Sequence, residues 1–388
     1  MITRAITPEL LTLLQEYPVV TLLGPRQSGK TTLARMALPD FEYLSLETPD
    51  MHQHAQSDPR AFLGQHPPPV IFDEIQRAPE LLRYIQTRID AHPENGQYVL
   101  TGSHQLELHA AITQSLAGRA ALLHLLPFSI RELDTAGITL GGFEDYIIRG
   151  FLPRIYDQNQ RPRTAYANYH QTYVERDVRQ IIRLRDAHLF NKFLRLLAGR
   201  VGQLIHYQSL AGDVGVDAKT IREWLSILEA SFLIFVLPPY FENFGKRVIK
   251  SPKYYFTDVG LLAYLLGIET PAQVLRDPLM GQLFENLVIL EALKTRYNQG
   301  KSAELYFYRD SHGHEIDLLY SLGRELGGVE IKAAATFHAS FKKTLLHFSR
   351  RQHSLAQSHV IYNGDAMDFS DGVRALHFRD ASGLFIGN

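Results

Sequence analysis

The sequence contains no cysteine among its 388 residues, which excludes disulfides, thiolate zinc sites and cysteine nucleophiles. It also lacks a long apolar run, since runs such as residues 232–237 are far shorter than the ~20 residues that span a bilayer. Neither sign of charge dominates, because 40 Lys and Arg face 41 Asp and Glu. A nucleic-acid surface would therefore need local basic clusters. The N-terminal residues lack the apolar core of a signal peptide, so we expect a cytoplasmic protein without a membrane partner.

Short apolar runs alternate with helical patterns through residues 1–130. The runs cover Val19–Leu23 and residues 43–46, 70–72, 98–100 and 122–126. Strands that alternate with helices predict an α/β fold in which helices cover both faces of a parallel sheet. Residues 131–200 lack this alternation and are rich in Leu, Arg and Tyr, and we interpret them as a helical lid.

A phosphate-binding pattern lies between the first strand and the next helix. Residues 24–31 read GPRQSGKT and satisfy G-x-x-x-x-G-K-[ST] without deviation. The glycines let backbone N–H groups surround phosphates, and the helix N-terminus adds its positive end. We expect Lys30 to reach the β- and γ-phosphates of ATP and Thr31 to bind Mg²⁺. The predicted nucleotide contacts are Gly24, Pro25, Arg26, Gln27, Ser28, Gly29, Lys30, Thr31, Thr32 and Thr101.

Two acids end the apolar run at residues 70–72. Asp73 is expected beside Mg²⁺, and Glu74 is expected to orient and deprotonate the attacking water. The strand after it ends at Thr101 and Ser103, where a hydroxyl could sense the state of the nucleotide; an ordinary turn explains these residues almost as well. ATP and Mg²⁺ are therefore the predicted cofactors.

Five segments resemble the AAA+ class, and more closely a bacterial and archaeal ATPase family with a C-terminal module. In chain order they are GPRQSGKTTL, VIFDEIQ, VLTGS, SLAGR and PFSIREL. The resemblance implies a five-stranded parallel ATPase core and active sites shared between subunits, hence a homo-oligomeric ring such as a hexamer. Arg119, in SLAGR, stands where AAA+ proteins place an arginine that acts in the neighbour's site. A surface or lid-packing arginine explains it equally well.

Residues 201–270 predict a winged helix-turn-helix. The pattern is a helix from Tyr207, a turn at residues 212–215, a helix capped by Asp217, and strands around residues 233–237 and 254–256. Basic residues on the second helix and on the loop between the strands are the predicted DNA contacts. They are Lys219, Arg222, Lys246, Arg247, Lys250 and Lys253. Many winged helices bind only protein, so that alternative stays open.

Residues 271–388 resemble the PD-(D/E)xK nuclease fold. Glu330 and Lys332 are two residues apart and so share one face of a strand. Asp317 on the neighbouring strand could meet Glu330 at a shared Mg²⁺, Glu285 could complete the pocket from a helix, and Lys332 could activate water. Ile316 stands where the family usually has proline. Such modules also occur as DNA-binding units, so cleavage stays open.

The leading interpretation is an AAA+ ATPase that remodels or translocates on DNA, including branched DNA. The expected domains are the ATPase core at 1–130, the lid at 131–200, the winged helix at 201–270 and the restriction-endonuclease-like α/β domain at 271–388. One alternative is a nucleotide switch that acts through protein partners. Another is a Mg²⁺-dependent nuclease gated by ATP.

Overall fold

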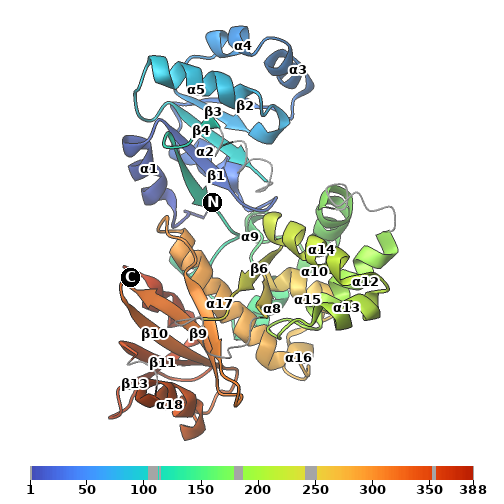
Figure 1. Ribbon diagram of the computed structural model, residues 1–388, viewed down its shortest axis with the longest axis vertical. Coiled ribbons are helices and arrows are strands. Elements are labelled where there is room, and N and C mark those ends of the chain that lie inside the picture. The colour runs from blue at the N-terminus through green and yellow to red at the C-terminus, as the bar shows by residue number, and fades with distance from the viewer. Residues whose placement is uncertain are drawn as a thin grey trace. The chain divides into compact units, whose positions relative to one another are not determined.

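The computed structural model describes residues 2–103, 112, 115–178, 187–240, 251–351 and 355–387. Contacts within the chain group it into two compact units, and Figure 1 labels most of their helices and strands. The first unit comprises Met1–Phe128 with the short segments Ala230–Phe232 and Tyr297–Lys301. The second holds the remaining residues, from Ser129 onward.

A five-stranded sheet forms the centre of the first unit, with strand order β2-β3-β4-β1-β5. All of its strand pairs are parallel, as the alternation of strands and helices predicted. Because the strands are parallel, their carboxyl ends meet at one edge, where α/β sheets bind ligands. The strands are β1 (Val19–Leu23), β2 (Glu42–Ser45), β3 (Val70–Asp73), β4 (Tyr98–Gly102) and β5 (Ala120–His124).

Helices cover both faces of this sheet. On one face, Val20 and Leu22 of β1 pack in one buried cluster with residues of α1 and α2. On the other, the ring of Phe62 from α4 lies 5.9 Å from that of Phe72 in β3. Because side chains on both faces are buried, β1 and β3 are apolar apart from Thr21 and Asp73. The helices are α1 (Thr7–Glu16), α2 (Lys30–Ala37), α3 (Pro49–Ser57), α4 (Pro59–Gln65) and α5 (Leu81–Ala91), with a 3-10 turn η1 (Ile75–Arg77).

The second unit begins with helices, as expected for residues 131–200. A buried carboxylate, Asp258, ties this region to α15 (Val259–Leu266). Asp258 accepts hydrogen bonds from the Tyr166 hydroxyl at 2.6 Å, the Phe151 N–H at 3.0 Å and the Gly260 N–H at 2.8 Å. The contacts thus group the predicted lid with the predicted winged helix. The helices before it are α7 (Ile130–Thr135), α8 (Phe143–Arg149), α9 (Pro153–Asp157), α10 (Pro162–Tyr169), the π-helical η2 (His170–Val178) and α12 (Ala187–Ala198).

Two helices and an antiparallel strand pair form the middle of the second unit. They are α13 (Tyr207–Val214), α14 (Ala218–Ala230), β6 (Ile234–Leu237) and β7 (Lys253–Phe256). The turn predicted at residues 212–215 is wrong in its position, because α13 continues to Val214. Gly215 ends the helix with a φ of 97°, a left-handed conformation that glycine adopts without steric cost.

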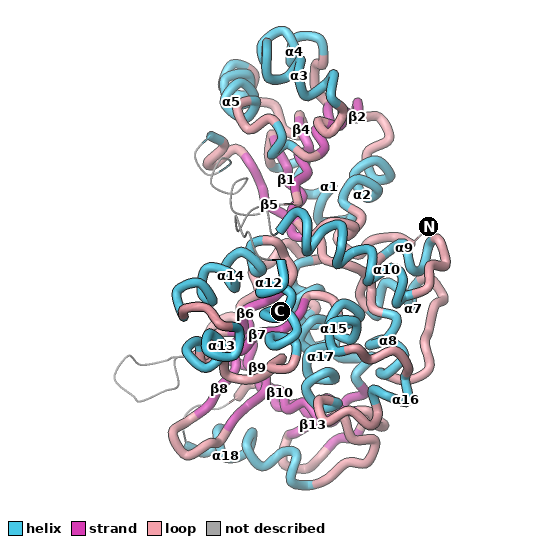
Figure 2. The backbone as a smooth tube through the Cα atoms, turned by 90° about the vertical axis from the view of Figure 1, so that its right-hand side faces the viewer, coloured by secondary structure: helices cyan, strands magenta, loops and turns pink. Residues whose placement is uncertain are grey.

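A six-stranded mixed sheet dominates the C-terminal part, in the order β12-β13-β11-β10-β9-β8. One of its faces packs against α18 (Lys343–Arg351) through Leu345 and Phe348. Figure 2 shows the backbone of α18 beside this sheet. The long helix α17 (Met280–Tyr297) and the short α16 (Pro271–Val274) precede it. The strands are β8 (Leu305–Arg309), β9 (Glu315–Leu322), β10 (Glu325–Lys332), β11 (Gln357–Tyr362), β12 (Met367–Asp368) and β13 (Val373–His377), with 3-10 segments η3 (Ala339–Lys342) and η4 (Phe378–Phe385). No helix in the described ranges is long and apolar enough to cross a membrane.

Candidate active site

The GPRQSGKT segment forms a tight loop between β1 and α2. A Cβ atom on Gly24 would lie 2.1 Å from the carbonyl oxygen of Leu125, so only glycine fits. Gly29 has a φ of 93° and is the N-cap of α2, while Gln27 has a φ of 62°. These left-handed residues turn the backbone so that the loop leads directly into the N-terminus of a helix, where N–H groups have no helical partner.

Arg4, to which no sequence motif points, stabilises this loop through hydrogen bonds to backbone carbonyl groups. Its buried guanidinium donates hydrogen bonds to the carbonyl oxygens of Ser28 and Leu126, both at 2.6 Å. It thereby joins the phosphate-binding loop to the end of β5. A lone arginine far from the motif carries no local pattern, so only the fold reveals this role.

Lys30 lies across the loop. Its Nζ donates hydrogen bonds to the carbonyl oxygens of Gly24 and Pro25, each at 2.9 Å. Burial lowers the pKa of Lys30 to about 8, although Glu74 and Asp73 favour its charged form. An anion would stabilise this buried ammonium, whose hydrogen-bond partners among the described residues are neutral carbonyl groups. Lys30 is positioned to contact such an anion at the loop.

Asp73, at the end of β3, accepts hydrogen bonds from three hydroxyl groups. Thr31 Oγ1 lies 3.0 Å from its Oδ1, the Tyr43 hydroxyl 2.8 Å from its Oδ2 and Thr101 Oγ1 2.5 Å from its Oδ1. Within the described part of the chain, Asp73 has these partners and no ion pair. Burial and the neighbouring carboxylate raise the pKa of Tyr43 to about 12, so its hydroxyl stays protonated and donating. The sequence pattern does not single out Tyr43, because an aromatic residue in a strand is typical of a core position.

Glu74 adopts a left-handed backbone conformation, with φ 57° and ψ 49°. Its N–H donates to Thr101 Oγ1 at 3.1 Å, and its carboxylate accepts from Ser103 Oγ at 3.1 Å and from the amide of Gln76. Such a conformation costs about 1–3 kcal/mol in a non-glycine residue and persists where the surroundings enforce it. The structure therefore brings both predicted acids and both predicted hydroxyls together. Gln76 is an additional partner to which the sequence analysis gave no role.

Arg119 lies at the opposite edge of the same sheet. It precedes β5, whose Ala120 is in register with Val19 at the start of β1. Its guanidinium pairs with Asp90, at 2.6 and 3.0 Å, and its side chain is 33% exposed. The length of β1, about 17 Å, separates it from the phosphate-binding loop of its own chain. A role in a neighbour's site stays a prediction.

The predicted nuclease-like residues also come together, but with an unexpected lysine. Lys332 Nζ lies 2.9 Å from Asp317 and 2.7 Å from Glu330. Lys253 Nζ lies 3.1 Å from Glu285 and 2.5 Å from Glu315. Although burial penalises its charge, Asp317 has a pKa below the usual range, because Lys332 and Lys253 lie beside it. Burial, with Asp317 beside it, raises the pKa of Glu330.

This arrangement corrects the assignment of Lys253 to a basic DNA-binding loop. Its side chain is 4% exposed and begins the buried strand β7, where two carboxylates neutralise it. No group of three or more His, Cys, Asp or Glu in the described ranges is arranged to hold a metal ion. Metal binding by Asp317 and Glu330 therefore stays a prediction without geometric support.

The remaining predicted DNA contacts divide into two groups. Lys219 and Arg222 lie exposed on α14, where Lys219 is 3.8 Å from Glu223 and the guanidinium of Arg222 lies 5.4 Å from the Tyr207 ring centre. Lys246, Arg247 and Lys250 lie outside the described residues.

Comparison with known proteins places the chain in a family. Over 371 residues the chain is 30% identical to the uncharacterized protein Rv2008c of Mycobacterium tuberculosis and equally to Mb2031c of Mycobacterium bovis, covering 94% of this chain and 80% of each relative. The chain belongs to the family of these proteins. Residues 16–134 match the family described as "AAA domain", residues 140–272 the "Domain of unknown function (DUF8612)" and residues 280–380 the "Domain of unknown function (DUF4143)". The first unit is thus an AAA-type domain with a P-loop ATPase core.

Solved structures with some likeness to the chain are more distant. The Walker-type ATPase of Pyrococcus abyssi is 18% identical with a TM-score of 0.45, over 67% of this chain and 94% of that one. AMPPCP-bound DnaA of Aquifex aeolicus is 13% identical with a TM-score of 0.29, over 58% of this chain and 85% of that one.

Proposed function

We propose that this chain is an AAA-type ATPase that binds Mg²⁺-ATP at residues 24–31 and hydrolyses it with Glu74 as the general base. The observation that carries the proposal is the carboxylate of Asp73, which meets the hydroxyl of Thr31 at the end of β3 without an ion pair among the described residues. A strand-end carboxylate and the hydroxyl that follows the P-loop lysine are the pair that ligates Mg²⁺ in such sites.

The loop residues fit a triphosphate. Gly24 permits the close backbone turn, and the Ser28 hydroxyl is buried without a hydrogen-bond partner among the described residues. Lys30 has a third N–H beyond the two that it donates to the loop carbonyls. A phosphate would satisfy both groups. Bound Mg²⁺ would neutralise charge that develops on the phosphate oxygens, and Thr31 and Asp73 are the residues that would hold it.

The acids have separate tasks in this proposal. Asp73 is occupied by hydroxyl donors and acts on the metal side, whereas Glu74 turns back toward Ser103 and Gln76. Glu74 orients a water molecule and accepts its proton as that water attacks the γ-phosphate. Ser103 and Gln76 hold the carboxylate in place before the water arrives. Glu74 has a left-handed backbone conformation, and the two neighbouring carboxylates have different hydrogen-bond partners.

We further propose that the chain works as a homo-oligomer in which Arg119 completes the site of a neighbour. Its partial exposure and its place at the far end of β1 support this role, because Arg119 cannot reach its own nucleotide. An arginine supplied across an interface would stabilise the charge that spreads over the γ-phosphate.

DNA is the proposed partner of the second unit. The support is the sequence of α13, α14, β6 and β7, with Lys219 and Arg222 exposed on the second helix. The competing role, a nucleotide switch that binds protein through the same helices, predicts ATP turnover that ignores DNA. Cleavage of DNA is not proposed, because ammonium groups already neutralise the carboxylates of the C-terminal cluster.

ATP turnover measured without DNA, and with linear duplex, single strand or four-way junction, tests this function. We expect Mg²⁺-dependent turnover in every sample and an increase with at least one DNA. Turnover that no DNA changes would leave the ATPase intact and favour the protein-binding switch. The absence of turnover in every sample would overturn the ATPase itself.

A further inference from the structure

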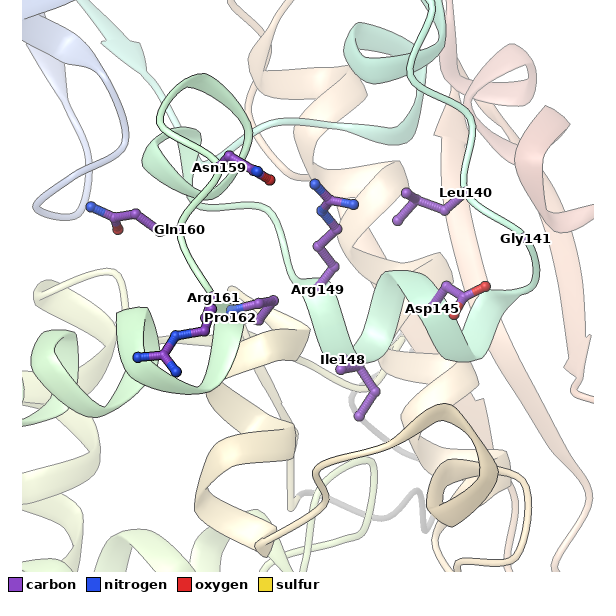
Figure 3. Close-up of a pocket in the computed structure, with 9 residues that line it drawn as sticks. All are labelled: Leu140, Gly141, Asp145, Ile148, Arg149, Asn159, Gln160, Arg161 and Pro162. Atoms are coloured by element: carbon purple, nitrogen blue, oxygen red, sulfur yellow. The ribbon is translucent and has the colours of Figure 1, made fainter.

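A cavity of about 500 Å³ opens in the second unit, away from every residue assigned above. Its walls come from α8, from the turn between α9 and α10, and from the segment just before α8 (Figure 3). This volume lies within the range of pockets that hold small organic ligands, about 300–1,000 Å³. The cavity is therefore a candidate for a second binding site.

Arg149 is the central charged residue of this cavity. Figure 3 shows its guanidinium rising from the end of α8 between Asn159 and Leu140. Its Cζ lies 5.0 Å from the centre of the Tyr156 ring, and its Nε is buried without a hydrogen-bond partner among the described residues. No carboxylate in the described ranges forms an ion pair with it. A guanidinium offers five N–H donors in a rigid fork that matches an oxyanion.

Further positive potential surrounds Arg149. Arg161 is the N-cap of α10, and no side chain caps this helix. Pro162 at its first position has no N–H, so the N–H groups of the next two residues are the ones that lack helical partners. Figure 3 shows the Arg161 side chain pointing away from Arg149, so it lies at the rim rather than in the centre. The carbonyl oxygens of Leu140 and Gly141, which could have paired with Arg149, accept hydrogen bonds from Arg379 instead. An anion would complete this arrangement.

The other residues that line the cavity indicate the chemistry of the rest of the ligand, beyond its anionic group. Asp145, one turn before Arg149, uses Oδ2 to accept from the Gly142 N–H and leaves Oδ1 without a partner among the described residues. Such a carboxylate oxygen repels an anion but accepts a hydrogen bond from a hydroxyl group. Leu140, Ile148 and Pro162 add apolar surface for a carbon skeleton. The lining thus offers a site for negative charge at one end and for hydroxyl groups at the other.

We propose that this cavity binds a phosphorylated sugar, either free or as part of a nucleotide, with the phosphate at Arg149 and a sugar hydroxyl at Asp145. The Arg149 guanidinium at the centre, the N-terminus of α10 and the positive charge of Arg161 at the rim match the charge of a phosphate monoester better than that of a single carboxylate. Asn159, on the turn opposite Arg149, contributes its amide to the phosphate. The site is separate from the phosphate-binding loop, and its occupation does not depend on ATP hydrolysis.

Calorimetric titration of the full chain carrying Lys30→Ala, which removes binding at the P-loop, tests this proposal. Ribose 5-phosphate and AMP are the probes, and ribose is the control without phosphate. We expect at least one phosphorylated probe to bind, and ribose to bind far more weakly. Binding of ribose 5-phosphate alone would identify a free sugar phosphate, and binding of AMP alone a nucleotide. Ribose binding as tight as that of the phosphorylated probes would overturn the proposal. So would the absence of binding by either phosphorylated probe at concentrations up to about 10 mM, which correspond to the weakest affinity that defines a site.

Arg149→Gln should weaken binding by about tenfold to a hundredfold, because a charged hydrogen-bonding partner is lost. Arg154→Gln, at an exposed arginine of α9 outside the cavity, is the matched control and should bind as the parent does. Should Arg149→Gln fail to fold, Asn159→Ala on the exposed turn should still weaken binding severalfold. Equal affinity in all variants, or equal losses in Arg149→Gln and Arg154→Gln, would contradict the proposal. None of these results bears on ATP hydrolysis, because turnover is measured separately in the parent protein, which retains Lys30.

Discussion

The chain contains two clusters of acidic residues, one in each unit, and they differ in what surrounds the carboxylates. Asp73 in the first unit accepts hydrogen bonds from the hydroxyls of Thr31, Tyr43 and Thr101. The carboxylates of the C-terminal cluster are instead paired with the ammonium groups of Lys253 and Lys332. Hydroxyl groups can rotate to share a carboxylate with a metal ion, whereas an ammonium already supplies the positive charge.

The comparison shows that acids in the expected order do not by themselves define a metal site. Both clusters were found from short sequence patterns, and both are assembled in the structure. The difference comes from residues distant in sequence. Tyr43 joins Asp73 from the neighbouring strand, and Lys253 reaches Glu285 and Glu315 from a separate two-stranded sheet. We expect the first cluster to carry chemistry and the second to carry stability.

The largest effect is expected from Lys30→Ala, which should abolish measurable ATP binding. The substitution removes the buried ammonium that meets the phosphates in the ground state, together with its hydrogen bonds across the loop. Fluorescent ATP-analogue binding by the full chain measures it. Binding at the parent affinity would show that the hydroxyl-rich cluster is not the nucleotide site.

The pH dependence of ATP binding sharpens the same prediction. Since burial lowers the pKa of Lys30 to about 8, the free protein loses this charge as the pH rises through that value. Bound phosphates favour the charged form, so affinity should fall by about tenfold between pH 7 and pH 9. Lys30→Arg keeps its charge and should bind with a flat profile over this range.

Arg119→Ala should lower ATP turnover by about 10³-fold or more while leaving ATP binding intact, if it supplies charge to a neighbour's site. This experiment asks whether the first cluster is complete within one chain. Mixing the Arg119→Ala protein with the Glu74→Gln protein should restore part of the turnover, because some interfaces then combine an intact arginine with an intact base. Unchanged assembly without any recovery would indicate that Arg119 acts only through its pair with Asp90.

Lys253→Met should destabilise the second unit by about 3–5 kcal/mol, because it leaves the buried Glu285 without its cation, whereas Glu315 keeps its ion pair with Arg309. The midpoint of urea unfolding measures this loss. Lys219→Met, at an exposed lysine of α14, is the matched control and should change stability by less than about 0.5 kcal/mol. Equal stability of the two variants would mean that the C-terminal cluster does not depend on its lysines.

The smallest effect is expected from Tyr43→Phe, which removes one of the hydroxyl donors to Asp73. Asp73 keeps Thr31 and Thr101, so the Mg²⁺ concentration for half-maximal turnover should rise only about fivefold, corresponding to roughly 1 kcal/mol. Tyr84→Phe, at a tyrosine that is 38% exposed, should leave the Mg²⁺ dependence unchanged. If the Mg²⁺ concentration for half-maximal turnover is unchanged in Tyr43→Phe, the Tyr43 hydroxyl does not contribute to Mg²⁺ binding.

Much of the first unit could be predicted because its signals are local in sequence. Apolar runs located all five strands, and the bounds of β1 are those expected, while the acids that follow β3 are adjacent in the chain. The residues that were missed act through tertiary contacts. Arg4 reaches the loop from the N-terminal segment, and Gln76 contacts Glu74 only because the backbone turns at that glutamate.

The second unit was harder to predict, because its parts share contacts. Asp258 joins α15 to Phe151 and Tyr166, which the sequence had assigned to a separate lid. Lys253 stands beside a run of basic residues and so looked like one of them, although it begins a buried strand. A sequence pattern gives the charge of a lysine but not the burial that decides its partner.

ATP binding and ATP turnover measured side by side on Glu74→Gln test the central claim most directly. Glu74 lies beside Ser103 and Gln76 rather than among the partners of Asp73, so its removal should spare the ground-state complex. We predict an ATP affinity close to that of the parent and a turnover rate lower by about 10²–10⁴-fold, the usual cost of losing a general base. Turnover at the parent rate would contradict the assignment of the chemistry to this cluster.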